Sequence, residues 1–339
     1  MIWSKQKILV TGGASFIGSH LIDHLVEKGA KSIRVVDDLS SGKRKNIKQH
    51  IGSGVVKFIK NDLLKPGVPE NAVKGIDVVF HLAAIHGGRG FLDLHQALCS
   101  QNIAMDGWIV KAAHEAGVKK FVFASSGCVY PNHLQTDTRK KLYLTEDMVG
   151  PPYDADNTYG WAKLMTEITL KSYYKDFGFK SASCRFFTVY GERGVESHAV
   201  IAMIARAFTD QNPFEVWGDG TQIRNWTYVK DIVRGMVLAA EKIDDGTAIN
   251  LGTEERIRVI NAVKEILNYT NKKARIKLLK DMPTGPVNRV ASNKLAKKLL
   301  GWQPEVKFID GLHKTIDWYF NNKDKNDVKK ILKLMLTER

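Results

Sequence analysis

A tyrosine and a lysine four residues apart, Tyr159 and Lys163, are the first pair in this sequence whose types and spacing could do chemistry. On a helix the two side chains share one face, about one turn apart. An ammonium group beside a phenol favours the phenolate, so the tyrosine pKa, ordinarily about 10, should fall toward neutrality. A phenolate can remove a hydroxyl proton while hydride leaves the same carbon. The spacing therefore predicts alcohol oxidation, provided that other elements supply a hydride acceptor.

The N-terminus predicts that acceptor. A short apolar strand at 7–10 is followed by Thr11-Gly12-Gly13-Ala14-Ser15-Phe16-Ile17-Gly18 and then by a helical run at 21–28. Backbone N–H groups at the start of such a helix bind a pyrophosphate, and the glycines let it approach closely. The middle glycine position holds Ser15, whose side chain must be fitted beside the phosphates. We expect cofactor contacts from Gly12, Ser15, Phe16, Ile17 and Gly18.

A second strand at 32–36 ends in Asp37-Asp38. This acidic pair comes about twenty residues after the glycine turn, where a carboxylate binds the adenosine ribose of a dinucleotide. A carboxylate there would repel a 2′-phosphate. The sequence therefore predicts NAD, rather than NADP, as the cofactor.

Apolar strands and helical stretches alternate through the first 190 residues. Further strands are predicted at 55–59, 78–83, 121–125 and 181–187, and helices at 103–116 and 161–177. Such alternation is typical of a parallel sheet with helices on both faces. We therefore predict an α/β fold with a doubly wound parallel sheet of the Rossmann type.

The pattern loosens after residue 190, where glycine and proline interrupt 191–220 and 282–286. Between these breaks, 228–242 is predicted to be helical and 248–251 to return to the sheet. We expect an NAD-binding domain from 1–190 plus 228–251. A smaller substrate domain is expected from 191–227 plus 252–322, closing over the carboxyl ends of the strands, with a basic tail helix at 323–339.

Composition argues against several other classes of protein. The 339 residues are 44% hydrophobic, and no apolar run approaches the ~20 residues needed to cross a membrane. No signal peptide pattern precedes the first strand, so we expect a cytoplasmic protein without membrane partners. Three widely spaced cysteines, with no C-x-x-C or H-E-x-x-H motif, indicate neither a disulfide framework nor a metal site.

The formal net charge is +15. A basic protein can bind nucleic acid, but these lysines are scattered and lack interleaved aromatic residues. A lysine-rich surface that suits an anionic substrate is the favoured interpretation, without a nucleic-acid partner.

The ordered motifs resemble those of the extended short-chain dehydrogenase/reductase family, in particular its nucleotide-sugar epimerases and dehydratases. The resemblance runs from about residue 7 to about residue 320. Its motifs are the glycine turn, Asn61-Asp62-Leu63, His81-Leu82-Ala83-Ala84, Ser125-Ser126, Tyr159 with Lys163, and the runs 185–191, 217–224 and 299–304.

The resemblance implies roles for further residues. Ser126, Tyr159 and Lys163 would be catalytic, and Arg224 and Arg289 would hold the diphosphate of a sugar nucleotide, since a guanidinium fork pairs two phosphate oxygens. A homodimer would form through the helices predicted at 103–116 and 161–177. Further cofactor contacts are implied for Ser41, Gly42, Asp62, Leu63, Leu82, Ala84, Tyr159 and Lys163. Further substrate contacts are implied for Gly88, Arg89, Thr188 and Trp217.

Within this family, Cys128 separates the alternatives. Epimerases that invert C4 usually carry threonine there, whereas the group of GDP-mannose 3,5-epimerase and GDP-L-fucose synthase carries an acid/base cysteine. The loop at 85–91 resembles the Gly-Gly loop of that group, and His198 occupies the place of its second acid/base. Oxidation at C4 acidifies C3–H and C5–H, which thiol and imidazole groups can then exchange. The alternative is that Cys128 is a small buried thiol and His198 a surface histidine.

The leading expectation is therefore an NAD-dependent epimerase that acts through a transient 4-keto sugar, at C3 and/or C5 of a GDP-hexose. A 4-epimerase of a UDP-hexose or UDP-hexuronate stays open, with Cys128 structural. So do a GDP-4-keto-6-deoxymannose epimerase-reductase and a non-catalytic nucleotide- or RNA-binding protein on the same fold. Asp37 argues against an NADPH-consuming reductase. Gly127-Cys128, where dehydratases carry Asp-Glu, argues against dehydration.

Overall fold

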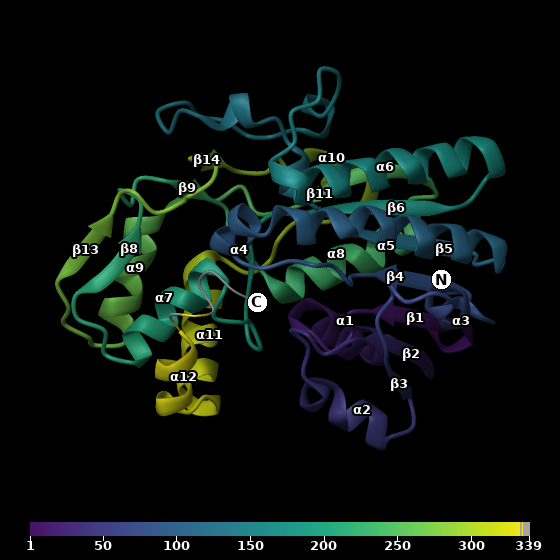
Figure 1. Ribbon diagram of the computed structural model, residues 1–339, viewed down its shortest axis with the longest axis horizontal. Coiled ribbons are helices and arrows are strands. Elements are labelled where there is room, and N and C mark those ends of the chain that lie inside the picture. Colours follow the sequence, from purple (N-terminus) through teal and green to yellow (C-terminus); the bar gives the residue numbers. More distant parts are fainter. Residues whose placement is uncertain (333, 335–339) are drawn as a thin grey trace.

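The computed structural model describes residues 1–332 and 334. Within them, a seven-stranded parallel sheet has the order β3-β2-β1-β4-β5-β6-β11 (Figure 1). The strand order changes direction between β1 and β4, the position at which open α/β sheets bind ligands. Its strands are β1 (Lys7–Thr11), β2 (Ser32–Asp37), β3 (Val56–Lys60), β4 (Val78–His81), β5 (Lys120–Ser126), β6 (Ser181–Phe186) and β11 (Asp245–Leu251).

Helices cover both faces of this sheet, so the predicted doubly wound fold is confirmed. Successive side chains of a strand point to opposite faces. Ile8 and Val10 of β1 accordingly join the core under α1 and α8, while Leu9 joins the core under α3, α5 and α6. These helices and their short neighbours are α1 (Phe16–Glu27), α2 (Lys48–Gly52), α3 (Val68–Val73), α4 (Arg89–Leu94), α5 (Gln96–Glu115), α6 (Asn157–Phe177), α8 (Val229–Lys242) and α10 (Lys294–Leu300). Short 3-10 helices are η1 (Trp3–Lys5), η2 (Arg44–Ile47), η3 (Gly127–Val129), η4 (Asn132–Gln135) and η5 (Glu146–Met148).

Several predicted boundaries differ from the structure, among them the start of α1, which begins at Phe16 and not at residue 21. The strand expected at 78–83 ends at His81, because Thr11 Oγ1 accepts hydrogen bonds from the N–H groups of Leu82 and Ala83 and turns the chain out of the sheet. The helices expected at 103–116 and 161–177 begin earlier, at Gln96 and Asn157. Tyr159 and Lys163 therefore do lie on one helix, as predicted.

The remaining segments form small sheets beside the carboxyl ends of the strands, on the left in Figure 1. Helix α7 packs with α9 and α11 around an apolar core that includes Trp226, Phe308 and Tyr319. The strands are β7 (Val189–Tyr190), β8 (Phe214–Trp217), β9 (Ile223–Arg224), β10 (Thr227–Tyr228), β12 (Ile257–Arg258), β13 (Ile276–Leu279) and β14 (Asn288–Arg289). The helices are α7 (Ala199–Phe208), α9 (Val259–Tyr269), α11 (Phe308–Asn322) and α12 (Lys325–Ile331).

The two-domain division predicted from the sequence stays a prediction. The tail helix expected at 323–339 corresponds in part to α12, and residues 333 and 335–339 lie outside the described residues. In the described part of the chain, no helix combines the length and apolar character that crossing a bilayer requires. The same residues contain no cluster of three or more His, Cys, Asp or Glu side chains arranged to hold a metal ion.

Candidate active site

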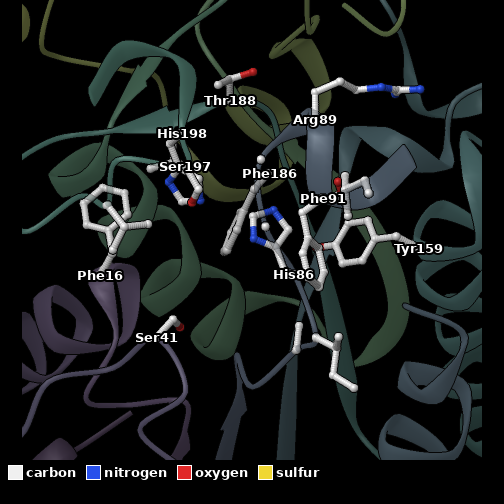
Figure 2. A pocket seen from close by; sticks show the side chains of 18 of the residues that line it. Phe16, Ser41, His86, Arg89, Phe91, Tyr159, Phe186, Thr188, Ser197 and His198 are labelled. Carbon is white, nitrogen blue, oxygen red and sulfur yellow. The ribbon is translucent and has the colours of Figure 1, made fainter. Parts of the chain in front are cut away.

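A cavity of about 1050 Å³ lies at the carboxyl ends of the central strands and extends to α7, β8 and β9. Figure 2 shows Tyr159 and Phe91 on one side of it, His86 at its centre, and Phe16 and His198 across from them. Most residues predicted for the site line this cavity: Gly12, Ser15, Phe16, Ile17, Asp37, Asp38, Ser41, Asp62, Leu63, Leu82, Ala84, Gly88, Arg89, Ser126, Cys128, Tyr159, Lys163, Thr188, His198, Trp217, Arg224 and Arg289.

Gly18 and Gly42 are the predicted site residues that do not line the cavity. Each supports the site from behind, because a side chain would collide with the backbone or with a carboxylate. A Cβ at Gly18 would overlap the Gly12 carbonyl oxygen, and a Cβ at Gly42 would lie 2.7 Å from Asp37 Oδ1. Their predicted contact with the cofactor stays a prediction.

The turn between β1 and α1 fits a dinucleotide pyrophosphate. Gly12 has a positive φ of 66°, and a Cβ there would lie 2.9 Å from the Ala83 nitrogen. Ser15 precedes the first helical residue, and its hydroxyl bonds back to the Gly12 carbonyl at 2.5 Å. The serine side chain is thereby held against the turn. The first N–H groups of α1 face a cavity wall that the glycines keep open.

The adjoining end of the cavity fits an adenosine ribose. Asp37, at the end of β2, is 6% exposed and accepts hydrogen bonds from the N–H groups of Ala14 (2.9 Å) and Leu39 (2.8 Å). These bonds fix the carboxylate beside the glycine turn. Asp38 accepts from the backbone and hydroxyl of Ser40. An acidic wall of this kind accommodates ribose hydroxyls and disfavours an added phosphate.

Lys163 is buried under Tyr159 and belongs to a polar chain that enters the sheet. Its Nζ lies 3.5 Å from Asp106 Oδ2 and 5.7 Å from the centre of the Tyr159 ring. Asp106 also interacts with His81 Nε2 at 2.9 Å, and His81 Nδ1 interacts with Thr11 Oγ1 at 2.7 Å. Asp106 therefore compensates the lysine charge that the sequence argument had assigned to the phenol.

The predicted fall in the tyrosine pKa is wrong for the chain by itself. Burial raises the pKa of Tyr159 well above 10, and the neighbouring Cys128, Asp106 and Cys99 raise it further. A hydrogen-bond interaction with Ser126 opposes this shift. Burial also lowers the pKa of Lys163. Loss of solvation thus outweighs the effect of an ammonium that already has its own counter-ion.

Cys128 lies directly beside Tyr159, in a buried cluster with Phe91, Leu92 and Cys99. The Cys128 N–H donates to Ser126 Oγ at 3.1 Å, and its carbonyl accepts from the Asp156 N–H at 2.8 Å. The guanidinium of Arg289 contacts its Sγ at 3.3 Å. The turn that carries Cys128 therefore docks onto the first turn of α6.

His198 immediately precedes α7 and faces the same cavity. Its Nδ1 is buried and, among the described residues, has no hydrogen-bond partner. Burial lowers the pKa of His198 to about 4, against the opposing charge of Glu196. The imidazole is therefore neutral near pH 7 and able to accept a proton.

His86 is a candidate that the sequence argument missed. Its ring centre lies 5.2 Å from that of Tyr159 and 5.4 Å from that of His198, so it stands between the two (Figure 2). The sequence signal was its place next to Gly87-Gly88. A Cβ at Gly88 would overlap the Ser197 carbonyl oxygen, so this glycine brings the two loops together.

Two arginines pair with one carboxylate on the substrate side, and a third arginine lines the same part of the cavity. Asp156 accepts both Arg89 Nη1 (2.9 and 3.0 Å) and Arg289 Nη2 (3.0 Å). Among the residues that the structure describes, Arg224 donates only to the carbonyl oxygens of Ile223 and Thr284. Burial, followed by the charges of Arg289 and Arg89, lowers the pKa of Arg224 to about 9.

Arg206 is a further buried cation that the sequence argument missed. It is 5% exposed, lines the cavity from α7 and, within the described residues, makes no ion pair. Burial lowers its pKa to about 10, opposed by Glu215. The signal available in the sequence was an arginine inside the apolar run 199–208. Arg206 and Arg224 are thus two buried guanidinium groups without an ion-pair partner among the described residues, and this part of the cavity favours an anionic ligand.

The chain is similar to known proteins over most of its length. Residues 8–252 match the model of the NAD dependent epimerase/dehydratase family. GDP-mannose 3,5-epimerase 1 of Oryza sativa subsp. japonica is 34% identical over 324 residues, which cover 93% of this chain and 82% of that protein.

Two solved structures are similar throughout. UDP-glucuronic acid 4-epimerase from Bacillus cereus, in complex with UDP-glucuronic acid and NAD, is 30% identical with a TM-score of 0.83, covering 96% of this chain and 99% of that one. UDP-glucose 4-epimerase from Thermotoga maritima, with UDP-glucose, is 29% identical with a TM-score of 0.81, covering 93% and 99%.

Proposed function

Because the chain belongs to the NAD dependent epimerase/dehydratase family, we propose that it is an epimerase acting at C3, C5 or both of the hexose in a GDP-sugar. NAD is the cofactor of this family, and the glycine turn and Asp37 fit it. When bound, NAD supplies the acceptor that takes a hydride from C4 and returns it. The observation that carries the proposal is the approach of Cys128 and His198 to the cavity around Tyr159.

Two proton carriers besides the tyrosine favour chemistry at carbon. Inversion at C4 needs only a group that takes and returns the hydroxyl proton. Inversion at C3 or C5 of a 4-keto sugar needs a base and an acid on opposite faces of the carbon. The depressed pKa of His198 keeps its imidazole neutral near pH 7, the form in which it can accept a proton, and the thiol of Cys128 can supply the proton on the other side.

Tyr159 then acts on the C4 hydroxyl. Ser126 is the neighbour whose hydrogen bond lowers the pKa of that phenol, so it assists the proton transfer. Lys163 is held by Asp106 under the ring and fixes the position of the site. The three groups take and return one proton, while Cys128 and His198 exchange protons with the ring carbons.

The diphosphate would be held by Arg224 and Arg289. Arg224 forms no ion pair with a carboxylate in residues 1–332 or 334. Arg289 can exchange Asp156 and Cys128 for phosphate oxygens. Pairing a diphosphate would remove the penalty of leaving Arg224 charged in a buried site. A diphosphate here also brings the hexose toward Cys128.

Arg206 and Glu215 support guanine as the base. Both line the cavity, as Arg224 does. A guanidinium can pair with O6 and N7 of guanine, and a carboxylate can accept from its N–H groups. Uracil offers a single N–H between two carbonyls, which uses such a pair less fully. The rice relative is itself named a GDP-mannose 3,5-epimerase.

The test is turnover of GDP-mannose in deuterated water, with UDP-sugars in parallel. We expect deuterium in the hexose at C3, C5 or both, because only carbon acid/base chemistry exchanges those positions. Cys128→Ala should retain oxidation at C4 but lose exchange at one carbon, whereas Tyr159→Phe should lose both. Cys184→Ala is the matched control, since Cys184 is buried in β6 away from the cavity wall.

A second candidate is a UDP-hexose or UDP-hexuronate 4-epimerase. Cys128 lies in an apolar cluster with its sulfur against Arg289, which also fits a purely structural thiol. The similar Bacillus cereus enzyme is named a UDP-glucuronic acid 4-epimerase. Inversion of a UDP-sugar at C4 without deuterium in the ring, unchanged in Cys128→Ala, would establish this candidate and overturn the first.

A further inference from the structure

We propose that Lys323, in the C-terminal segment between α11 and α12, is a positioning residue that holds His198 in place through Glu196. The inference rests on the proposed function only in giving His198 a catalytic role. Lys323 lies beyond residues 8–252, which match the family model, and it is 125 residues from His198 along the chain.

Glu196 is the link between the two. It is 2% exposed, and its Oε1 accepts a hydrogen bond from Tyr319 Oη and another from Lys323 Nζ, both at 2.6 Å. Lys323 is itself largely buried, with 17% of its side chain exposed. Two donors on one buried oxygen fix the backbone of the loop two residues before His198.

The same loop is held from the opposite side. The Ser197 carbonyl oxygen packs against Gly88 so closely that a Cβ there would overlap it. Residues 196–198 therefore lie between the C-terminal segment and the Gly-Gly loop, and Figure 2 shows Ser197 and His198 together facing His86. A loop clamped on both sides has little freedom to move its imidazole.

The C-terminal segment is anchored well enough to act as a clamp. Val328 of α12 is 2% exposed in the core around α7, and Lys325 forms an ion pair with Asp210, just past the end of α7. Ile331 reaches the wall of the cavity itself. The helix that starts after His198 and the tail that holds Glu196 thus pack against each other.

The charges around His198 make the effect measurable. His198 lies near the Glu196 carboxylate of its own loop. From the elements packed on that loop, it contacts the His86 ring and the apolar Phe16 ring. Glu196 in turn faces the ammonium groups of Lys323 and Lys43 and the Tyr319 phenol. Removing Lys323 leaves the Glu196 carboxylate less compensated, which favours the imidazolium form of His198.

The experiment compares Lys323→Met, Lys323→Arg and the wild-type chain by NMR titration of ¹³C-labelled histidine. His198→Asn assigns the resonance. We expect Lys323→Met to move the His198 titration upward by about one pH unit and Lys323→Arg to restore it. Lys325→Met, which removes a lysine of the same tail that pairs with Asp210, should leave it unchanged.

Three results would overturn the inference: no shift in a folded Lys323→Met chain, failure of the arginine variant to restore it, or the same shift in Lys325→Met. Should Lys323→Met not fold, Glu196→Gln provides the second test, because removal of that carboxylate must lower the His198 titration. The titration needs no substrate. A shift in a chain that turns over no sugar nucleotide upholds the clamp and refutes the proposed function, whereas turnover without a shift does the reverse.

Discussion

Replacing Gly160 by alanine tests whether the contact between α6 and the Cys128 turn sets the catalytic geometry. Gly160 is buried in α6, next to Tyr159. A Cβ at this position would overlap the Cys128 carbonyl oxygen and lie 3.2 Å from the Cys128 Cβ. That carbonyl already accepts the Asp156 N–H at 2.8 Å and cannot simply turn away.

The magnitudes separate an effect on activity from an effect on stability. Inserting one methyl into a packed contact costs about 1–3 kcal/mol, while glycine to alanine inside a helix returns about 1 kcal/mol. The free energy of unfolding should therefore fall by at most about 2 kcal/mol. A displacement of about 1 Å between reacting groups lowers turnover roughly 100-fold. Activity should thus decrease far more than stability.

The assay is kcat for deuterium incorporation from GDP-mannose, together with urea unfolding of the same preparation. Gly52→Ala is the control, because Gly52 ends α2 and a Cβ there meets nothing within 4 Å. That variant should keep wild-type turnover. Turnover of Gly160→Ala within threefold of wild type would refute the claim that this contact sets the geometry of the site.

Three further outcomes are expected. Burial lowers the pKa of His20 to about 4, below the value of about 6.5 in the unfolded chain. The contribution of His20 to the free energy of unfolding is therefore complete above pH 6.5 and falls by up to about 3 kcal/mol as the pH drops to 4. In His20→Gln, the urea midpoint should depend less on pH between pH 7 and 4.5 than it does in the wild type. The purified chain should bind NAD in preference to NADP because of Asp37, and a titration that favours NADP would contradict the ribose site. Trp161 and Met165 of α6 are 43% and 49% exposed, so the chain should sediment as a homodimer and Trp161→Glu as a monomer; a monomeric wild type would exclude this interface.

Much of the fold could be predicted because its signals are local. Apolar runs of strand length that alternate with amphipathic helices specify a parallel sheet. In such a sheet the loops after the strands gather at one edge, so residues as distant in sequence as Gly12 and Tyr159 could be assigned to one site without knowing any distance. Arg224 was assigned to the site by the family resemblance, and its side chain lines the cavity.

Boundaries and supporting residues were less accessible. The early end of β4 depends on the Thr11 hydroxyl, which lies 71 residues before Leu82 in the sequence. Gly18 and Gly42 are predicted cofactor contacts, and the structure adds that each leaves room for a neighbour, Gly12 and Asp37 respectively. A glycine pattern in the sequence indicates where a side chain would not fit. Only the folded structure shows which neighbouring atoms occupy that space.

The sequence by itself determined the fold class and the family, since these follow from periodicity and from ordered motifs. It also indicated many of the side chains that line the cavity, but neither His86 nor Arg206. Tertiary structure alone decided how those side chains are charged. Asp106 forms an ion pair with Lys163, and burial raises the pKa of Tyr159, whereas the spacing of Tyr159 and Lys163 predicted a fall. The solvation and the counter-ions of a side chain depend on all of its neighbours in space. Lys323, for example, donates a hydrogen bond to Glu196, which lies 127 residues earlier in the sequence.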